Sequence, residues 1–318
     1  MKKFLKKLAL FTLLIYGISW LLYAALNKFE RDYYAKGMKT RWIMNQKDQH
    51  VDFLFLGSSR MANTVAGHQL DSALHTKSLN IATAGSSYGE SYALFYAFLK
   101  NGNTTKTLVL TLDLFKSRHR DYDAEKITTL VFKKFDLFPL YAEDTVREVY
   151  REYSKEVNLL LWDCIPFSRY AEYNSYFRFK DLLAYSKGEM FAPAFDTISG
   201  EQLVPHNKFK GDLKATPGGI QLGPRGDKYL LEILKLANQH HINIILVTAP
   251  YYKAQAFDRD FHNRYVTFLK KKFKAEYLDF SVRKDWSDKQ NFSDAIHTNA
   301  RGSRIFTKEL SDSLKNCK

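Results

Sequence analysis

The chain has 318 residues, which suits one large α/β domain with an insertion or two modest domains. Hydrophobic residues make up 45% of it and aromatic residues 15%, which excludes a disordered, collagen-like or coiled-coil protein. Lysine and arginine number 48 against 34 acidic residues, a formal net charge of +14. The surface should therefore attract an anionic partner such as nucleic acid, anionic lipid or an anionic glycopolymer.

The amino terminus begins MKKFLKK, and residues 8–26 then form an apolar stretch without a charge. As a helix this stretch would be about 28 Å long, close to the roughly 30 Å hydrocarbon core of a bilayer. We therefore predict an N-terminal transmembrane helix that stays on the protein. A cleaved signal peptide is one alternative, although its apolar region is usually only about 7 to 15 residues long. A buried core helix is another, although such helices seldom run this long without a charge.

The orientation of this helix follows from the layout of the chain rather than from its flanking charges. Four lysines precede the apolar stretch and five basic residues follow it within about 15 positions, so the positive-inside rule does not decide. A short tail before the span and a large domain after it are typical of a signal anchor whose bulk is exported. We expect a single-pass membrane protein with an extracytoplasmic bulk, periplasmic or at the cell surface. Such a domain meets little nucleic acid, and no finger or RNA-binding motif is present, so we expect no nucleic-acid partner.

After a charged connector at residues 28–50, short apolar runs alternate with helical stretches. We predict strands at 51–56, 79–82, 107–114, 242–248 and 276–280. Helices are predicted at 86–100, 227–239, 259–273 and 299–314. This alternation favours an α/β fold with a parallel sheet covered on both faces. In such sheets the chemistry lies beyond the carboxyl ends of the strands.

One stretch, about residues 116–223, lacks this alternation of strand-like and helix-like segments and is rich in aromatic and charged residues. A loop of that length is implausible inside a domain, so we predict a mainly helical insertion. Its aromatic residues are expected to pack in the ordinary way, with a groove for glycan or lipid as the alternative. The predicted divisions are a tail and anchor at 1–27, the connector, and an α/β domain at 51–318 that contains the insertion. Cys164 and Cys317 fit neither a metal-ligand spacing nor a disulfide framework, and we expect no metal and no cofactor.

Gly57-Ser58-Ser59-Arg60 directly follows the first predicted strand. A serine at the end of a parallel strand and the start of a helix is well placed for nucleophilic attack, because free backbone N–H groups there stabilise an oxyanion. Gly57 permits the tight turn. The alternatives are a serine that only caps the helix and a phosphate-binding turn, which usually holds more glycine.

Far downstream, Asp294 and His297 stand just before the last predicted helix. A spacing of three predicts that both lie on one side of a helical turn, where the carboxylate can hold the imidazole in one tautomer and stabilise its charged form. This arrangement suits a general base. Taken alone, the pair is equally compatible with a metal-binding or surface role.

Together these segments resemble blocks I and V of the SGNH (GDSL-like) hydrolase superfamily, and residues 80–85 (NIATAG) resemble block II. The resemblance covers roughly residues 51–115 and 225–316 and implies a three-layer, flavodoxin-like fold. It further implies that Ser59 is the nucleophile, His297 the base and Asp294 its orienting partner. The backbone N–H groups of Ser59 and Gly85 would form the oxyanion hole. Ser58 stands where GDSL members have aspartate.

Block III of the family, G-x-N-D, should supply an asparagine to the oxyanion hole, but residues 110–115 (LTLDLF) contain none. A missing donor can cost about 10² to 10³ in rate. Asp113 would bring negative charge close to the forming anion unless it points elsewhere or pairs with an arginine such as Arg60. We place Asp113 and Arg60 among the candidate substrate-binding residues.

The serine-rich block I and the amino-terminal anchor are similar to those of membrane-tethered SGNH-like proteins of D-alanine transfer to teichoic acids and of exopolysaccharide O-acetylation. Those proteins work beside membrane-bound O-acyltransferases. The resemblance implies a membrane-anchored extracytoplasmic serine esterase or O-acyltransferase that acts on acyl groups of a cell-envelope glycan. The alternative is a non-catalytic SGNH-like binding or assembly partner of a membrane-bound O-acyltransferase. Exposed basic residues such as the lysine run at 270–272 are expected to be solvated, with anionic polymer or lipid headgroups as possible ligands.

Overall fold

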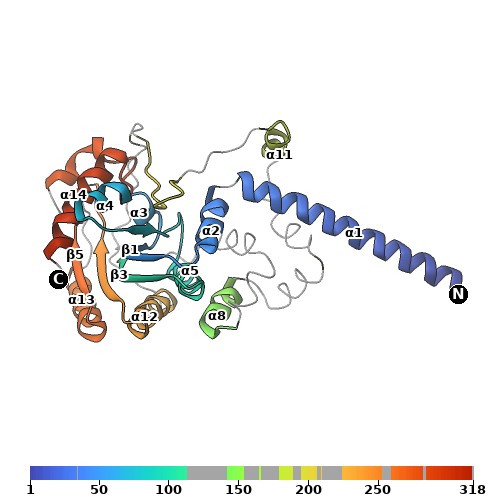
Figure 1. Cartoon of the computed structure of the whole chain (residues 1–318), viewed down its shortest axis with the longest axis horizontal. Helices are drawn as coiled ribbons and strands as arrows, with labels where there is room; N and C mark the ends of the chain where they lie inside the picture. The colour runs from blue at the N-terminus through green and yellow to red at the C-terminus, as the bar shows by residue number, and fades with distance from the viewer. Residues whose placement is uncertain are drawn as a thin grey trace. The chain divides into compact units, whose positions relative to one another are not determined.

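The structure, a computed structural model, describes residues 1–33, 35–112, 142–153, 165, 179–188, 195–205, 209, 224–252, 259–281 and 284–316. The chain forms two compact units, each built from two stretches of sequence (Figure 1). The first unit comprises Met1–Arg41 and Lys126–Ala192. The second comprises Trp42–Glu125 and Pro193–Lys318 and is called the sheet unit below.

The first unit begins with a long helix, α1 (Lys2–Tyr33). Residues Lys2–Leu26 of this helix are long and apolar enough to cross a membrane, as the sequence predicts, and only 6% of the most apolar window is buried. So little burial does not fit the core helix of a soluble protein. The predicted connector is itself mostly helical, because α1 continues to Tyr33 and α2 (Ala35–Asn45) follows it.

The predicted insertion is described only in part. Its described helices are α8 (Asp144–Tyr153) and α11 (Phe179–Ser186). The ring of Tyr185 on α11 contacts Phe29 of α1 edge to face, with centroids 5.3 Å apart. The mainly helical character of residues 116–223 stays a prediction, since most of that stretch lies outside the described residues.

The sheet unit is built on five parallel strands in the order β2-β1-β3-β4-β5. Their bounds are β1 (His50–Leu56), β2 (Ser78–Asn80), β3 (Thr104–Thr111), β4 (Asn243–Thr248) and β5 (Glu276–Asp279). All five predicted strands are confirmed, with their ends shifted by at most three residues. The strand order reverses between β1 and β3, so the carboxyl ends of these two strands flank the crevice in which doubly wound sheets bind their ligands.

The second halves of β1 and β3 and most of β4 are apolar, because there both faces of the sheet are buried. Leu54 and Leu108 are fully buried toward one face, whereas Phe55 and Val109 are fully buried toward the other. Leu54 pairs with Leu108 and Phe55 with Val109, so like residues stand side by side across β1 and β3.

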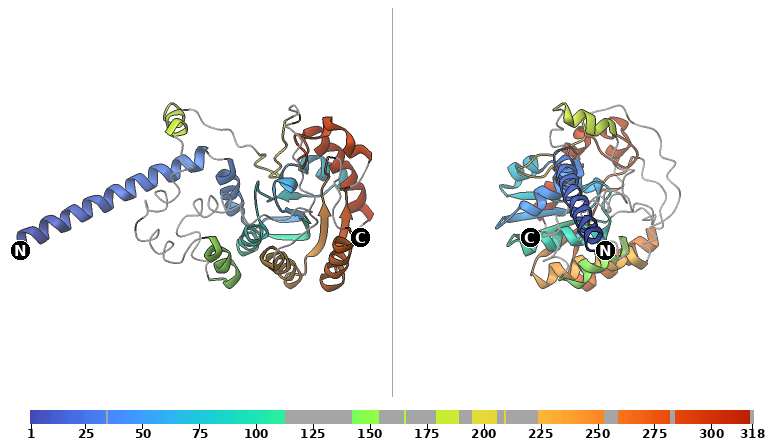
Figure 2. Two further views of the ribbon diagram at one scale, coloured as in Figure 1. Left: turned by 180° about the vertical axis from the view of Figure 1, so that it is seen from behind. Right: turned by 90° about the vertical axis from the view of Figure 1, so that its right-hand side faces the viewer.

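Helices cover both faces, as Figures 1 and 2 show. On one side lie α5 (Tyr88–Lys100), α12 (Pro224–Gln239) and α13 (Arg259–Phe273), and on the other lie α4 (Gly67–Leu74) and α14 (Ala300–Asn316). A short helix, α3 (Ser59–Ala62), follows β1 directly. The side of α4 and α14 holds a core cluster that includes Phe55, Val109, Trp286, Phe306 and Leu310. The sequence predicts α5, α12, α13 and α14 but not α3 or α4.

Candidate active site

The turn from β1 into α3 depends on Gly57, whose φ is +146°. A Cβ at this position would lie 1.7 Å from Thr111 Oγ1, so only glycine allows the end of β1 to approach β3 this closely. Ser58 then caps α3, since its Oγ accepts a hydrogen bond from the backbone N–H of Arg60 at 3.3 Å. Ser59 is therefore the first residue of the helix, at the carboxyl end of a central strand.

The second segment of the site is a bend at residues 293–297 that the side chain of Asp294 closes. Its Oδ1 accepts hydrogen bonds from the backbone N–H groups of Ile296 and His297, both at 2.9 Å. The Ser293 N–H donates to the carbonyl of His297 at 2.9 Å. The predicted helical turn is wrong in form, because these side-chain bonds replace helical ones, as aspartate favours. The prediction that Asp294 and His297 lie side by side is nevertheless confirmed.

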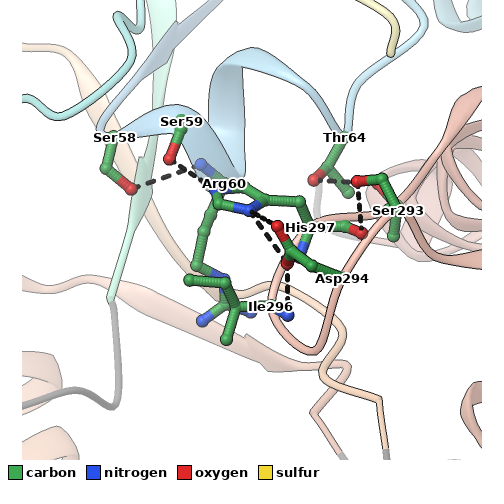
Figure 3. A network of polar contacts seen from close by, with 9 residues as sticks. Ser58, Ser59, Arg60, Thr64, Ser293, Asp294, Ile296 and His297 are labelled. Atoms are coloured by element: carbon green, nitrogen blue, oxygen red, sulfur yellow. Dashed lines mark hydrogen bonds and ion pairs between the residues drawn. The ribbon is translucent and has the colours of Figure 1, made fainter. Parts of the chain in front are cut away.

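The structure brings the two segments together although Ser59 and His297 are 238 positions apart (Figure 3). Ser59 Oγ lies 2.7 Å from His297 Nε2. His297 Nδ1 lies 2.8 Å from Asp294 Oδ2 and 3.0 Å from Oδ1. An ionised carboxylate only accepts hydrogen bonds, so Nδ1 carries a proton here and Nε2 of the neutral ring is left to accept the Ser59 hydroxyl.

The electrostatics of the pair support this arrangement. The side chains of His297 and Asp294 are 21% and 28% exposed. Burial raises the pKa of Asp294, but the hydrogen bond and charge of His297, with the two backbone N–H groups, outweigh it and hold the pKa below its ordinary value. Asp294 is therefore ionised at neutral pH and stabilises a positive charge on the ring.

Two backbone donors are candidates to receive an oxyanion. Gly85 lies in an exposed turn with φ +68°, closed by a 3.3 Å hydrogen bond from Ser86 N–H to the Thr83 carbonyl. The Thr83 N–H donates to the carbonyl of Gly57 at 3.2 Å, which ties this turn to the β1–α3 turn. Within the part of the chain that the structure describes, no acceptor is assigned to the N–H of Ser59 or of Gly85. As far as the described residues are concerned, both donors are thus open to an oxyanion.

Asn80, at the end of β2, fixes these two turns to each other. Its side chain is 1% exposed. Nδ2 donates to the carbonyl of Met61 in α3, and Oδ1 accepts from the N–H of Ala82, each at 3.1 Å. The sequence marks Asn80 only as the start of block II, although an asparagine within a predicted buried strand is itself a signal of a structural hydrogen-bond role.

A second set of polar contacts fixes the histidine segment to the segment after α3. Ser303 Oγ donates to the carbonyl of Asn63 at 2.7 Å, and Thr298 Oγ1 donates to Thr64 Oγ1 at 3.3 Å. Ser303 and Thr298 are fully or almost fully buried. These contacts hold α14, and with it His297, against the segment that carries Ser59. The sequence analysis does not predict them, because small hydroxyl side chains carry no pairing signal of their own.

Of the two candidate substrate-binding residues, Arg60 is described and has another role in this structure. Its side chain is 2% exposed, and Nη2 donates to the carbonyls of Ala249 and Pro250 at 2.6 and 2.9 Å. The guanidinium also lies 3.3 Å from the ring centroid of Tyr251. Arg60 therefore holds the loop after β4, and a substrate contact stays a prediction. Asp113 lies outside the described residues, so its pairing with Arg60 also stays a prediction.

Cys164 and Cys317 likewise lie outside the described residues. Among the residues that are described, no three His, Cys, Asp or Glu side chains gather to hold a metal ion, so Asp294 and His297 have no third ligand there. No protein-family model matches the chain, and no curated protein matches it.

Proposed function

We propose that this protein is a serine esterase or O-acyltransferase with Ser59, His297 and Asp294 as its catalytic residues. The observation that carries the proposal is the continuous hydrogen-bond relay from Ser59 Oγ to His297 Nε2 at 2.7 Å and from His297 Nδ1 to Asp294 at 2.8 Å. This order of hydroxyl, imidazole and carboxylate activates a serine for acyl transfer on several unrelated folds.

Each atom has a role in the proposed reaction. Ser59 Oγ attacks the acyl carbonyl carbon while its proton passes to His297 Nε2, and Asp294 stabilises the imidazolium. The N–H groups of Ser59 and Gly85 receive the oxyanion. When the tetrahedral intermediate collapses, the leaving alkoxide takes the proton from Nε2 and the acyl group stays on Ser59. Water or a sugar hydroxyl then gives its proton to Nε2, attacks the acyl carbonyl and releases Ser59.

The fold supports the same family resemblance. The strand order 2-1-3-4-5 is that of flavodoxin-like sheets, with Ser59 following β1 at the switch point. We therefore propose a three-layer SGNH-type fold for the sheet unit, with residues 116–223 as a mainly helical insertion.

The location and substrate class come from the sequence. The helix Lys2–Leu26, which is long and apolar enough to cross a membrane, supports an anchored protein. An extracytoplasmic bulk is part of the same proposal. The resemblance to tethered proteins of teichoic-acid and exopolysaccharide modification supports an acylated cell-envelope glycan as substrate, with a membrane-bound O-acyltransferase as partner. A net charge of +14 suits an anionic glycopolymer.

A second candidate function is a non-catalytic SGNH-like binding or assembly partner of a membrane-bound O-acyltransferase. The observation that favours it is the absence of asparagine from residues 110–115, where block III should supply an oxyanion donor. In that case the relay would remain while the stabilisation of the transition state was too weak for turnover.

Hydrolysis of aryl acetates by the full-length protein in detergent separates the two functions. The esterase proposal predicts turnover that Ser59→Ala abolishes. Ser58→Ala is the matched control, because it removes a hydroxyl from the same turn, including a capping bond worth about 1 kcal/mol, and leaves Ser59 in place. Equal activity in the wild type and Ser59→Ala would exclude Ser59 as the nucleophile, and no turnover in any of the three would favour the binding partner.

A further inference from the structure

Because all five strands are parallel, their amino-terminal ends share one edge of the sheet, opposite the edge that carries Ser59. The chain enters the sheet unit at this edge, through residues 42–49. That segment is fixed within the unit, since Asn103 Nδ2 donates to the carbonyl of Gln46 and Asn101 Nδ2 to that of Met44, both at 2.9 Å. The polypeptide that leads here comes from α1, the helix of membrane-spanning length.

This same edge is rich in lysine. The segments that lead into the strands, with the last helical turn before each, carry seven exposed lysines: Lys47, Lys77, Lys100, Lys270, Lys271, Lys272 and Lys274. The exposed acidic residues among these described segments and the first residues of the strands are Asp48 and Glu276. We call this surface the lysine edge. The lysine edge is therefore strongly positive. Asp52, the next carboxylate along β1, offsets little of this charge, because it is already paired with Lys106 at 2.7 Å.

The end of α13 adds an apolar side chain to the lysine edge. Phe268 is 44% exposed, and Lys272 Nζ lies 5.1 Å from its ring centroid. No ion pair is assigned to Lys270, Lys271 or Lys272 within the described residues. Exposed lysines beside an exposed aromatic ring suit the interfacial region of an anionic bilayer, where the ring enters the headgroup layer and the ammonium groups meet lipid phosphates.

We propose that the lysine edge of the sheet unit lies against the anionic surface of the membrane in which α1 is anchored. Tethering makes this contact effectively intramolecular, so weak contacts suffice. Isolated lysines, rather than the paired forks of arginine, suit a diffuse layer of headgroups. A consequence for the proposed site is that Ser59 faces away from the bilayer. Ser59 would lie above the membrane surface by about the length of β3, roughly 26 Å for eight residues. At that distance it would face a polymer rather than lipid.

The test uses the full-length protein in vesicles, with Cys164 and Cys317 replaced by serine. A fluorophore is placed on Gln239→Cys, an exposed position at the lysine edge, or on Gln290→Cys, an exposed position on the opposite edge. Quenching by a headgroup nitroxide lipid is compared between neutral vesicles and vesicles with about one third anionic lipid. The proposal predicts strong quenching at position 239 in anionic vesicles only, lost in high salt because screening shortens the reach of the charges.

The variant K270Q/K271Q/K272Q should weaken this association by about 100-fold, at about 1 kcal/mol per lysine. The matched control K228Q/K289Q/K308Q removes the same charge away from the lysine edge and should leave quenching unchanged. Equal quenching in neutral and anionic vesicles, equal quenching at both positions, or equal effects of the two triple variants would each overturn the proposal. The proposal would also be overturned if the protein did not float with neutral vesicles. Flotation with neutral lipid reports insertion of α1, on which the proposed contact depends. None of these readouts depends on esterase activity, so this proposal and the proposed function can fail separately.

Discussion

Replacement of Asp294 by asparagine separates the two tasks that this carboxylate performs. Asparagine retains an oxygen that can accept the hydrogen bonds from the N–H groups of Ile296 and His297, so the bend at 293–297 should survive. The amide NH₂, however, would meet His297 Nδ1 as a second donor. The imidazole would then favour the tautomer that carries its proton on Nε2, which cannot accept the proton of Ser59.

The size of the effect follows from the 2.8 Å distance between His297 Nδ1 and Asp294 Oδ2. Opposite unit charges at this separation attract by about 6 kcal/mol at an effective dielectric constant of 20 and by about 3 kcal/mol at 40. Since both side chains are about a quarter exposed, the lower figure is appropriate. At 1.36 kcal/mol per factor of ten, Asp294→Asn should reduce kcat/KM for an aryl acetate at least about 100-fold.

The assay is steady-state ester hydrolysis, with the thermal unfolding midpoint as a measure of folding. Asp288→Asn is the matched control, because Asp288 Oδ1 also accepts a backbone N–H two residues later, from Gln290 at 2.9 Å. The control should keep its activity. If Asp294→Asn retained more than about a third of wild-type activity in an active preparation, Asp294 would have no catalytic role and the relay would be a structural feature.

Two further predictions concern residues that position the site, and a third concerns the exposed pair of His68 and Asp196. Gly57→Ala should destabilise the protein by about 3 kcal/mol or more, since its Cβ would lie 1.7 Å from Thr111 Oγ1. Adding Thr111→Ala to this variant should recover part of the loss in unfolding midpoint. No recovery would show that the contact with Thr111 is not the cause. Asn80→Ala leaves the buried N–H of Ala82 without its acceptor and removes one of the donors to the Met61 carbonyl, so it should lower both the unfolding midpoint and the ester-hydrolysis rate. An unchanged rate would deny Asn80 a positioning role. The hydrogen bond to Asp196 raises the pKa of His68 above 6.5, although desolvation opposes this shift. The stability that the pair contributes is therefore fully present below pH 6.5, and it is lost as the pH rises through the pKa of the folded state. The difference in the free energy of unfolding between wild type and His68→Gln should therefore be less than about 1 kcal/mol at pH 6 and should shrink toward pH 8. A difference that stayed constant would contradict the assignment.

The strands were predictable because a parallel sheet buried on both faces requires continuous apolar runs. Helices α12 to α14 were predictable because one stripe of each faces the core. By contrast, α3 and α4 are too short for their apolar pattern to stand out, although their turns position Ser59. The third strand begins at Thr104 rather than at residue 107, because Thr104 pairs with His50 of β1. The apolar pattern of the segment itself contains no information about this pairing.

The candidate residues could be selected from the sequence, but their geometry could not. Ser59, Asp294 and His297 could be chosen because each stands at a strand or helix boundary, and the sheet topology brings those boundaries to one edge. The bend that Asp294 closes was not predictable, because a spacing of three fits a helical turn equally well. The burial of Arg60 against the carbonyls of Ala249 and Pro250 was not predictable either, since it depends on where the loop after β4 lies.

The nucleophilic role of Ser59 and its activation by His297 can be measured in one experiment. The full-length protein is treated with a fluorophosphonate and analysed by intact mass and peptide mapping. We expect one phosphonyl adduct on Ser59, none on Ser58, and about 100-fold slower labelling in His297→Gln. An adduct on another residue, or labelling of Ser59 at the same rate without the imidazole, would contradict it.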